Sequence, residues 1–162
     1  MAETKGITYI RMMIDVLGKK EVHLTKLLEL TTEQEAVLKA EEFNEAEFAL
    51  LIEKKSENLR KLDEFDSGFQ SIYNRVAEEL VNNKEEYKEQ ILEMQSLITR
   101  VTDLGVKLSA LEEKNKNALE VKFREKRQDI RQFKVSKQTA DKYYKNMIGM
   151  QTGASYFMDK KQ

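Results

Sequence analysis

The segment that decides the fold is Phe43-Asn44-Glu45-Ala46-Glu47-Phe48, which has the pattern of a helix N-terminus. Asn44 is a favoured N-cap residue, whose side-chain oxygen can accept a hydrogen bond from the N–H of Glu47, and the Glu47 carboxylate can reach back to the N–H of Asn44. Phe43 and Phe48 occupy the two ends of a hydrophobic staple. A helix therefore starts at Asn44, and we expect the chain to reverse its direction there.

Two long stripes of mostly apolar residues flank this segment. Their members recur in alternating steps of four and three residues, which keeps them on one face of a helix. The stripe before the segment consists of Ile10, Ile14, Leu17, Leu24, Leu28, Thr31 and Leu38. The stripe after it consists of Phe48, Ile52, Leu59, Leu62, Phe69, Tyr73, Val76 and Leu80, with Lys55 and Asp66 as polar interruptions. These stripes predict helices over 8–42 and 45–80.

A third stripe follows Asn83 and has a gap in it. Its first part is Tyr87, Ile91, Met94, Ile98, Val101, Leu108 and Leu111. Polar residues interrupt it over 112–117, and it resumes as Leu119, Phe123, Ile130, Phe133, Ala140, Tyr144 and Met147. The pattern predicts a helix over 84–147 that is either very long or broken near 115–117, followed by a flexible tail over 148–162.

The composition agrees with an all-helical chain. Ala, Glu, Lys, Leu and Arg supply 77 of the 162 residues, while Pro is absent and Gly occurs only six times. Such a composition is typical of long helices and coiled coils, and it provides too few turn residues for a β-sandwich or an α/β enzyme. We therefore expect an all-α fold, a long antiparallel helical hairpin or coiled-coil bundle of three helices, which forms one domain over 1–162.

The predicted third helix is too long for its neighbours. At 1.5 Å per residue it would extend about 95 Å, so roughly 40 Å of it would project beyond the first two helices. An isolated projecting helix is marginally stable in water and would expose its apolar stripe. Either the chain bends at 115–117 and folds back, or the projecting stripe awaits a partner. The sequence favours the partner.

Charge is distributed unevenly along the chain. The formal net charge is −1, yet residues 28–113 carry a net charge of −11 and residues 114–162 carry +8. Either the basic last third has a separate role, or it lies along the acidic helices and neutralises them.

Signals for catalysis, metals and cofactors are missing from the sequence. The single histidine, His23, has three lysines and a leucine as its helical neighbours, and no window contains three glycines. We therefore predict no catalytic, metal or cofactor site, and a protein that is not an enzyme. The longest apolar run, Phe48 to Ile52, is far shorter than the roughly 20 residues of a membrane span. Without a visible secretory signal, the expected location is the cytoplasm.

Two stretches resemble the FlgN family of flagellar type III export chaperones. The first runs from Leu24 to Leu62 and contains a leucine cluster, the acidic run Glu33-Gln34-Glu35-Ala36-Val37-Leu38 and, after the turn, Phe48, Leu51, Ile52, Lys55, Leu59 and Leu62. The second is the ending that follows Tyr144, Ser155-Tyr156-Phe157-Met158-Asp159-Lys160. Together they cover about a third of the chain.

The resemblance implies a cytoplasmic chaperone for flagellar hook-associated proteins, which form the hook–filament junction. Such a chaperone keeps the terminal helices of its clients unassembled and delivers the clients to the membrane export gate. A client helix of this kind would lie on the apolar stripe of the last third. We expect the client contact at Phe123, Ile130, Phe133, Tyr144 and Met147. We expect electrostatic steering from Arg127, Arg131, Lys134 and Lys137. Tyr156, Phe157 and Asp159 in the tail serve the client or the export gate, and each aromatic residue has internal core packing as its alternative.

Two other functions remain open at this point. A homodimeric coiled coil, in which basic segments pair with acidic helices, fits the same pattern. Nucleic-acid binding is the less favoured alternative, because the aromatic residues of the basic last third lie mainly on the helical stripe, where packing explains them. A membrane-surface helix is less favoured still, and no membrane insertion is expected.

Overall fold

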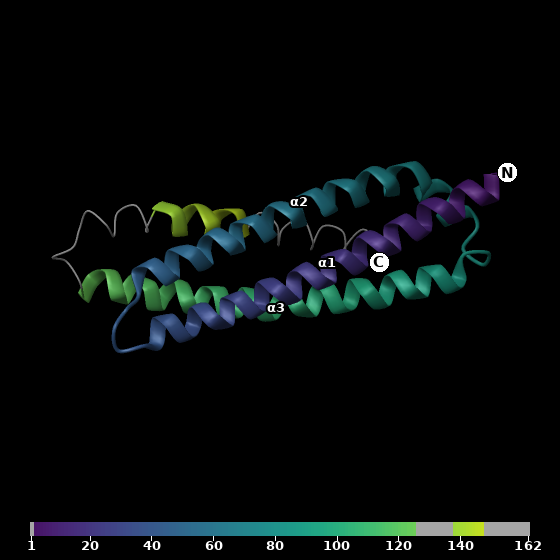
Figure 1. Cartoon of the computed structure of the whole chain (residues 1–162). Coiled ribbons are helices and arrows are strands. Elements are labelled where there is room, and N and C mark those ends of the chain that lie inside the picture. Colours follow the sequence, from purple (N-terminus) through teal and green to yellow (C-terminus); the bar gives the residue numbers. More distant parts are fainter. Residues whose placement is uncertain (1, 126–137, 148–162) are drawn as a thin grey trace.

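The computed structural model describes residues 2–125 and 138–147, and the described residues are almost all helical. Three long helices follow one another along the chain: α1 from Ala2 to Lys39, α2 from Glu45 to Asn82, and α3 from Lys88 to Glu125. Each long helix runs in the direction opposite to the one before it (Figure 1). A further short helix of residues 138–147 lies beside α2 and α3. The predicted all-α bundle of three long helices is therefore confirmed.

The reversal between α1 and α2 has the predicted cap. Asn44 adopts an extended conformation, with φ −85° and ψ 94°, and its side chain accepts a hydrogen bond of 3.1 Å from the Glu47 N–H. The Phe43 and Phe48 rings pack against each other with their centroids 5.5 Å apart, as a hydrophobic staple requires. The cap and the staple together fix the angle at which the chain enters α2.

Helix α1 is the centre of the bundle. It packs against both α2 and α3, whereas α2 and α3 make little contact with each other. The buried apolar residues form two clusters, one near the α1–α2 turn and one near the α2–α3 turn. The first cluster includes residues of all four described helices, and the second includes only residues of α1, α2, α3 and the turn between α2 and α3.

Several predicted helix boundaries are wrong. Helix α1 begins before Thr8, which lies inside it, and α2 extends past residue 80 to Asn82, with Asn83 as its C-cap. The proposed break at 115–117 lies within α3, which continues to Glu125. Asn115 is not at a bend because it is buried and its side chain donates a hydrogen bond of 3.0 Å to the Thr31 carbonyl on α1.

Candidate functional site

The helix of residues 138–147 packs onto the bundle through one apolar face. Its buried residues follow the spacing i, i+3, i+4 and i+7, which places them on one side of a helix. These residues are Ala140, Tyr143, Tyr144 and Met147, and each is at most 6% exposed. They join the apolar cluster near the α1–α2 turn. The short helix thus fills a position between α2 and α3.

This packing corrects the expectation that the last apolar stripe lacks a partner within its own chain. Tyr144, Met147 and Leu119 all lie in the same buried cluster, covered by α1, α2 and α3. The physical reason is that the helix of residues 138–147 packs back onto the bundle, where Tyr143 bonds to Glu112 of α3. The described part of the stripe is therefore packed into or against the protein's own core.

The residues that were predicted to contact a client have different positions in the structure. Phe123 is half-buried and packs against the core, and Tyr144 and Met147 belong to the core itself. The other predicted residues lie outside the described residues: Ile130, Phe133, Arg127, Arg131, Lys134, Lys137, Tyr156, Phe157 and Asp159. Their roles stay predictions. The three described members, Phe123, Tyr144 and Met147, pack in or against one buried cluster.

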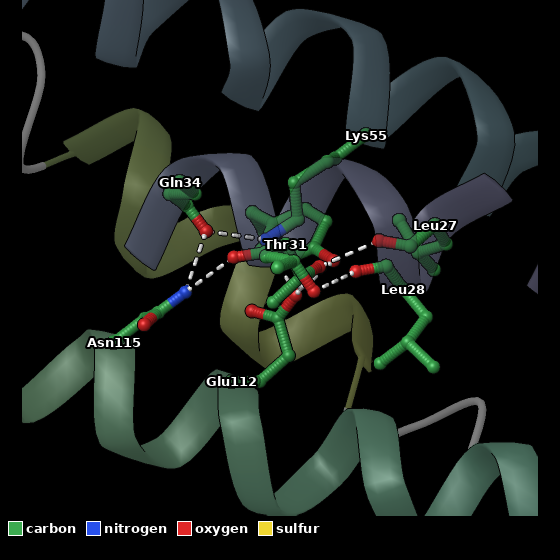
Figure 2. Close-up of polar contacts among 9 residues, drawn as sticks. Leu27, Leu28, Thr31, Gln34, Lys55, Glu112 and Asn115 are labelled. Atoms are coloured by element: carbon green, nitrogen blue, oxygen red, sulfur yellow. Dashed lines mark hydrogen bonds and ion pairs between the residues drawn. The ribbon is translucent and has the colours of Figure 1, made fainter. Parts of the chain in front are cut away.

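A buried polar cluster lies beneath the short helix. It is formed by Thr31 and Gln34 from α1, Lys55 from α2, and Glu112 and Asn115 from α3 (Figure 2). Lys55 has no exposed surface, and Glu112 is 3% exposed. Charged side chains at such depth are stable only when they are paired and hydrogen-bonded.

Glu112 Oε1 is the central acceptor of this cluster. It forms an ion pair with Lys55 Nζ and accepts a hydrogen bond of 2.8 Å from the Tyr143 hydroxyl of the short helix. The Thr31 hydroxyl lies 2.9 Å from the same oxygen and 2.7 Å from the Leu27 carbonyl, and it can donate to either. All four described helices therefore meet at one carboxylate.

Lys55 has two further contacts in the cluster. Its ammonium group donates a hydrogen bond of 2.6 Å to Gln34 Oε1 and lies 4.4 Å from the centre of the Tyr143 ring, a cation–π distance. Burial lowers the pKa of Lys55 to about 8, although the Glu112 carboxylate opposes this change. Burial also raises the pKa of the Tyr143 phenol well above its ordinary value, with a further contribution from Glu112. Tyr143 therefore stays protonated and donates at neutral pH.

Some polar atoms in this region have no hydrogen-bond partner among the described residues. They are Gln34 Nε2, Glu112 Oε2 and the Tyr144 hydroxyl. Burial raises the pKa of Tyr144, so its hydroxyl also remains protonated. Each unpaired buried group costs free energy, on the order of 1–3 kcal/mol.

The sequence alone does not reveal this cluster, although some of its members interrupt the apolar stripes. Lys55 stood out as a polar interruption of the second stripe, and Glu112 lay in the polar gap of the third stripe. A lysine and a glutamate at core positions of neighbouring helices are a signal for a buried ion pair. What the sequence could not provide was the register that aligns residue 55 with residue 112.

A shallow depression lies on another face of the bundle, between α1 and α3. It is lined by charges of both signs, and the Arg100 guanidinium forms a 2.6 Å ion pair with Glu21 at its edge. Within residues 2–125 and 138–147, no group of His, Cys, Asp and Glu side chains could hold a metal ion. None of the helices in these ranges has a stretch apolar and long enough to cross a membrane.

Comparisons with family models, with curated proteins and with solved structures found no match to this chain.

Proposed function

We propose that the protein is a cytoplasmic export chaperone similar to the FlgN family. In this proposal it binds terminal helices of flagellar hook–filament junction proteins, prevents their premature assembly and delivers them to the export apparatus. The resemblance of Leu24–Leu62 and of the ending Ser155–Lys160 supports the proposal. An all-α bundle is a suitable scaffold, because it offers long helical faces against which another helix can pack.

The observation that carries the proposal is the packing of the short helix of residues 138–147. The bundle accepts an amphipathic helix of ten residues between α2 and α3, through two tyrosines, a methionine and an alanine. A terminal helix that forms a coiled coil in a final polymer has the same kind of apolar face while it is a monomer. The bundle therefore has the chemistry to hold such a helix.

The structure limits how a client could use Tyr144 and Met147. Both side chains are buried, so a client reaches them only if the short helix leaves its position. Each large apolar side chain that leaves the core costs about 1.5–3 kcal/mol, which the client would have to offset. A client that packs elsewhere on the bundle avoids this cost.

The basic character of the region after α3 supports a role in steering. The last turn of α3 contains Lys122 and Arg124, and Arg127, Arg131, Lys134 and Lys137 follow in the sequence. Clustered positive charge accelerates the approach of an acidic client segment and weakens with added salt. We assign these residues to the encounter with the client rather than to the affinity of the final complex.

The proposal is tested by calorimetric titration of the purified full-length protein with terminal-helix fragments of hook–filament junction proteins. We expect micromolar or tighter binding, with a dissociation constant of about 1 μM or below. Matched fragments without the terminal helices serve as the control and should not bind. Binding should change little between low and moderate salt, unlike nucleic-acid binding. If no junction-protein fragment binds, the chaperone proposal is wrong.

Sedimentation at low and high protein concentration separates the chaperone from the homodimer alternative. A chaperone with a free helix-binding face should stay monomeric without its client. A dimer that persists at low concentration and does not dissociate on client addition would favour the structural coiled coil instead.

A further inference from the structure

The short helix of residues 138–147 is an addition to a bundle that holds together without it. Helix α1 packs directly against α2 and against α3. The second apolar cluster contains no residue of the short helix. In the first cluster the short helix supplies Ala140, Tyr143, Tyr144 and Met147, which lie beside many residues of the long helices. The three long helices can therefore stay packed when the short helix leaves.

The short helix covers two charged side chains. The Tyr143 ring lies 4.4 Å from the Lys55 ammonium group, and the Tyr143 hydroxyl donates a hydrogen bond of 2.8 Å to Glu112. Both charged groups are buried while the helix is in place. Burial lowers the pKa of Lys55 to about 8, because the charged ammonium group is more stable in water. Departure of the helix would give water access to both charges.

The docked helix also leaves polar atoms without partners. Among the described residues these atoms are Gln34 Nε2, Glu112 Oε2 and the Tyr144 hydroxyl oxygen. The donors that reach the Glu112 carboxylate are all directed at Oε1, so Oε2 has none. Buried unpaired atoms disfavour the docked state, because water would pair with them once the helix leaves. The apolar burial that holds the helix is therefore opposed by unpaired atoms and by two buried charges.

The outer side of the short helix adds no ion pair that would hold it on the bundle. Asp141, Lys142 and Lys145 are exposed, and none of them forms an ion pair with another described residue. The hydrogen bond from Tyr143 to Glu112 does hold it, and a single substitution can remove that bond.

We propose that residues 138–147 form an autoinhibitory helix, which occupies the client site between α2 and α3 until a terminal helix of the client displaces it. The inference rests on the proposed function and deepens it, since it names the client site and the contact that regulates it. A client that takes over the apolar contacts regains the burial that the departing helix gives up. Because only the open form binds the client, the apparent affinity falls with the fraction of molecules in that form.

The site selects a client helix by its chemistry. The client needs an apolar stripe with the spacing i, i+3, i+4 and i+7, as the short helix has. It also needs a hydroxyl or amide donor within that stripe, because a helix without one would bury the Glu112 carboxylate and not replace the bond from Tyr143. A second donor that reaches Glu112 Oε2 would make the client a better occupant than the short helix. A helix with a purely aliphatic stripe is a poor client.

The matched variants Tyr143→Phe and Tyr87→Phe test the autoinhibition. Both phenols are buried, and each donates a hydrogen bond of 2.8 Å to a glutamate, Tyr143 to Glu112 and Tyr87 to Glu79. Both variants therefore lose the same kind of bond. Tyr87, however, lies in the second apolar cluster, which has no residue of the short helix. The probe is the terminal-helix fragment of a junction protein, titrated calorimetrically into each full-length protein.

We expect Tyr143→Phe to bind the fragment about tenfold or more tightly than the unaltered protein does, because loss of a hydrogen bond to a charged group shifts the docking equilibrium of the short helix by about that factor. Tyr87→Phe should bind as the unaltered protein does. Equal affinity of all three proteins would show that the short helix does not block the site, while the chaperone function stands. Weaker binding by Tyr143→Phe would show that Tyr143 contacts the client and does not exclude it.

Hydrogen exchange of the unaltered full-length protein tests the opening directly. Without the fragment, the amides of 138–147 should exchange faster than those of residues 108–119 on α3, because the short helix opens before the bundle unfolds. Saturating fragment should accelerate exchange in 138–147 further and leave 108–119 protected. If both segments exchange together in the free protein, the short helix does not open separately and the inference is wrong.

Two further results would also overturn the inference. If neither the unaltered protein nor Tyr143→Phe binds a junction-protein fragment, the chaperone function fails and the inference fails with it. If Tyr143→Phe sediments as a dimer while the unaltered protein is a monomer, the vacated site accepts the short helix of a second copy and not a client.

Discussion

The Tyr143 hydroxyl donates a hydrogen bond of 2.8 Å to Glu112 Oε1, and this contact fixes the position of the short helix against α3. An apolar helix face alone could slide along the bundle by one turn with a modest change in buried area. A slide would remove the donor from a buried carboxylate, which is costly. The polar contact therefore selects one register for the helix of residues 138–147.

The first prediction compares two neighbouring tyrosines that differ in their hydrogen bonding. Tyr143→Phe removes the bond to the Glu112 carboxylate and should lower the free energy of unfolding by about 1.5–3 kcal/mol. Tyr144→Phe removes a buried hydroxyl that has no partner among the described residues, so it should be neutral or stabilising. Urea denaturation measures both, and hydrogen exchange of the amides in 138–147 should accelerate only in Tyr143→Phe. Equal losses in the two variants would contradict the assignment.

The second prediction concerns the buried ion pair. Lys55→Met leaves the Glu112 carboxylate buried without its cation, which should lower the free energy of unfolding by about 3–5 kcal/mol. The double variant Lys55→Met with Glu112→Leu removes both charges and should regain most of this loss, because buried pairs replaced by apolar residues are often neutral or stabilising. Chemical denaturation of the single and double variants provides the comparison. If the double variant loses as much free energy of unfolding as the two single variants lose together, the two residues do not interact.

The third prediction is a pH dependence that belongs to Lys55. Its pKa is about 8 in the folded protein, below the ordinary value of 10.5, because of burial. At a pH between these two pKa values, Lys55 is protonated in the unfolded chain and has lost its proton in the folded protein. The unfolded state then binds more protons, so the contribution of Lys55 to stability rises with pH across this window, by up to about 3 kcal/mol.

The Lys55→Met variant should lack this rise of the free energy of unfolding with pH. The difference in free energy of unfolding between the unaltered protein and the variant therefore isolates the contribution of Lys55. The buried tyrosines act in the opposite direction at higher pH, because their raised pKa values keep protons that the unfolded chain loses above about pH 10. Denaturation curves at several pH values from 8 to 10.5 would measure the difference. A difference that stays flat with pH would contradict a lowered pKa of Lys55.

The parts of the fold that depend on local signals could be predicted from the sequence. Asn44 and Phe43 with Phe48 fixed the reversal between α1 and α2, since a cap and a staple involve residues only a few positions apart. The spacing of the apolar stripes predicted an all-α fold for the same reason, because it too depends on residues close together in the sequence. The continuity of α3 through residues 112–117 could not be predicted in this way, because this polar run has the pattern of a break.

In the structure two members of that polar run, Glu112 and Asn115, are core residues. Their partners, Lys55, Thr31 and Tyr143, are 31 to 84 positions away in the sequence. Only the packing of four helices brings these groups together, so periodicity within one helix cannot reveal them. The same long-range packing turned Tyr144 and Met147 from surface candidates into core residues.

The last prediction decides whether the short helix is part of the stable core. Tyr144→Ser deletes a buried ring from the cluster near the α1–α2 turn and should lower the free energy of unfolding by about 3–5 kcal/mol, as other large-to-small changes in cores do. Lys145→Ser changes the next, exposed residue and should stay within about 0.5 kcal/mol. Thermal and urea denaturation would show the difference. If Tyr144→Ser leaves stability unchanged but abolishes binding of the client fragment, the short helix is itself the client site, and the packing described here is only one of its states.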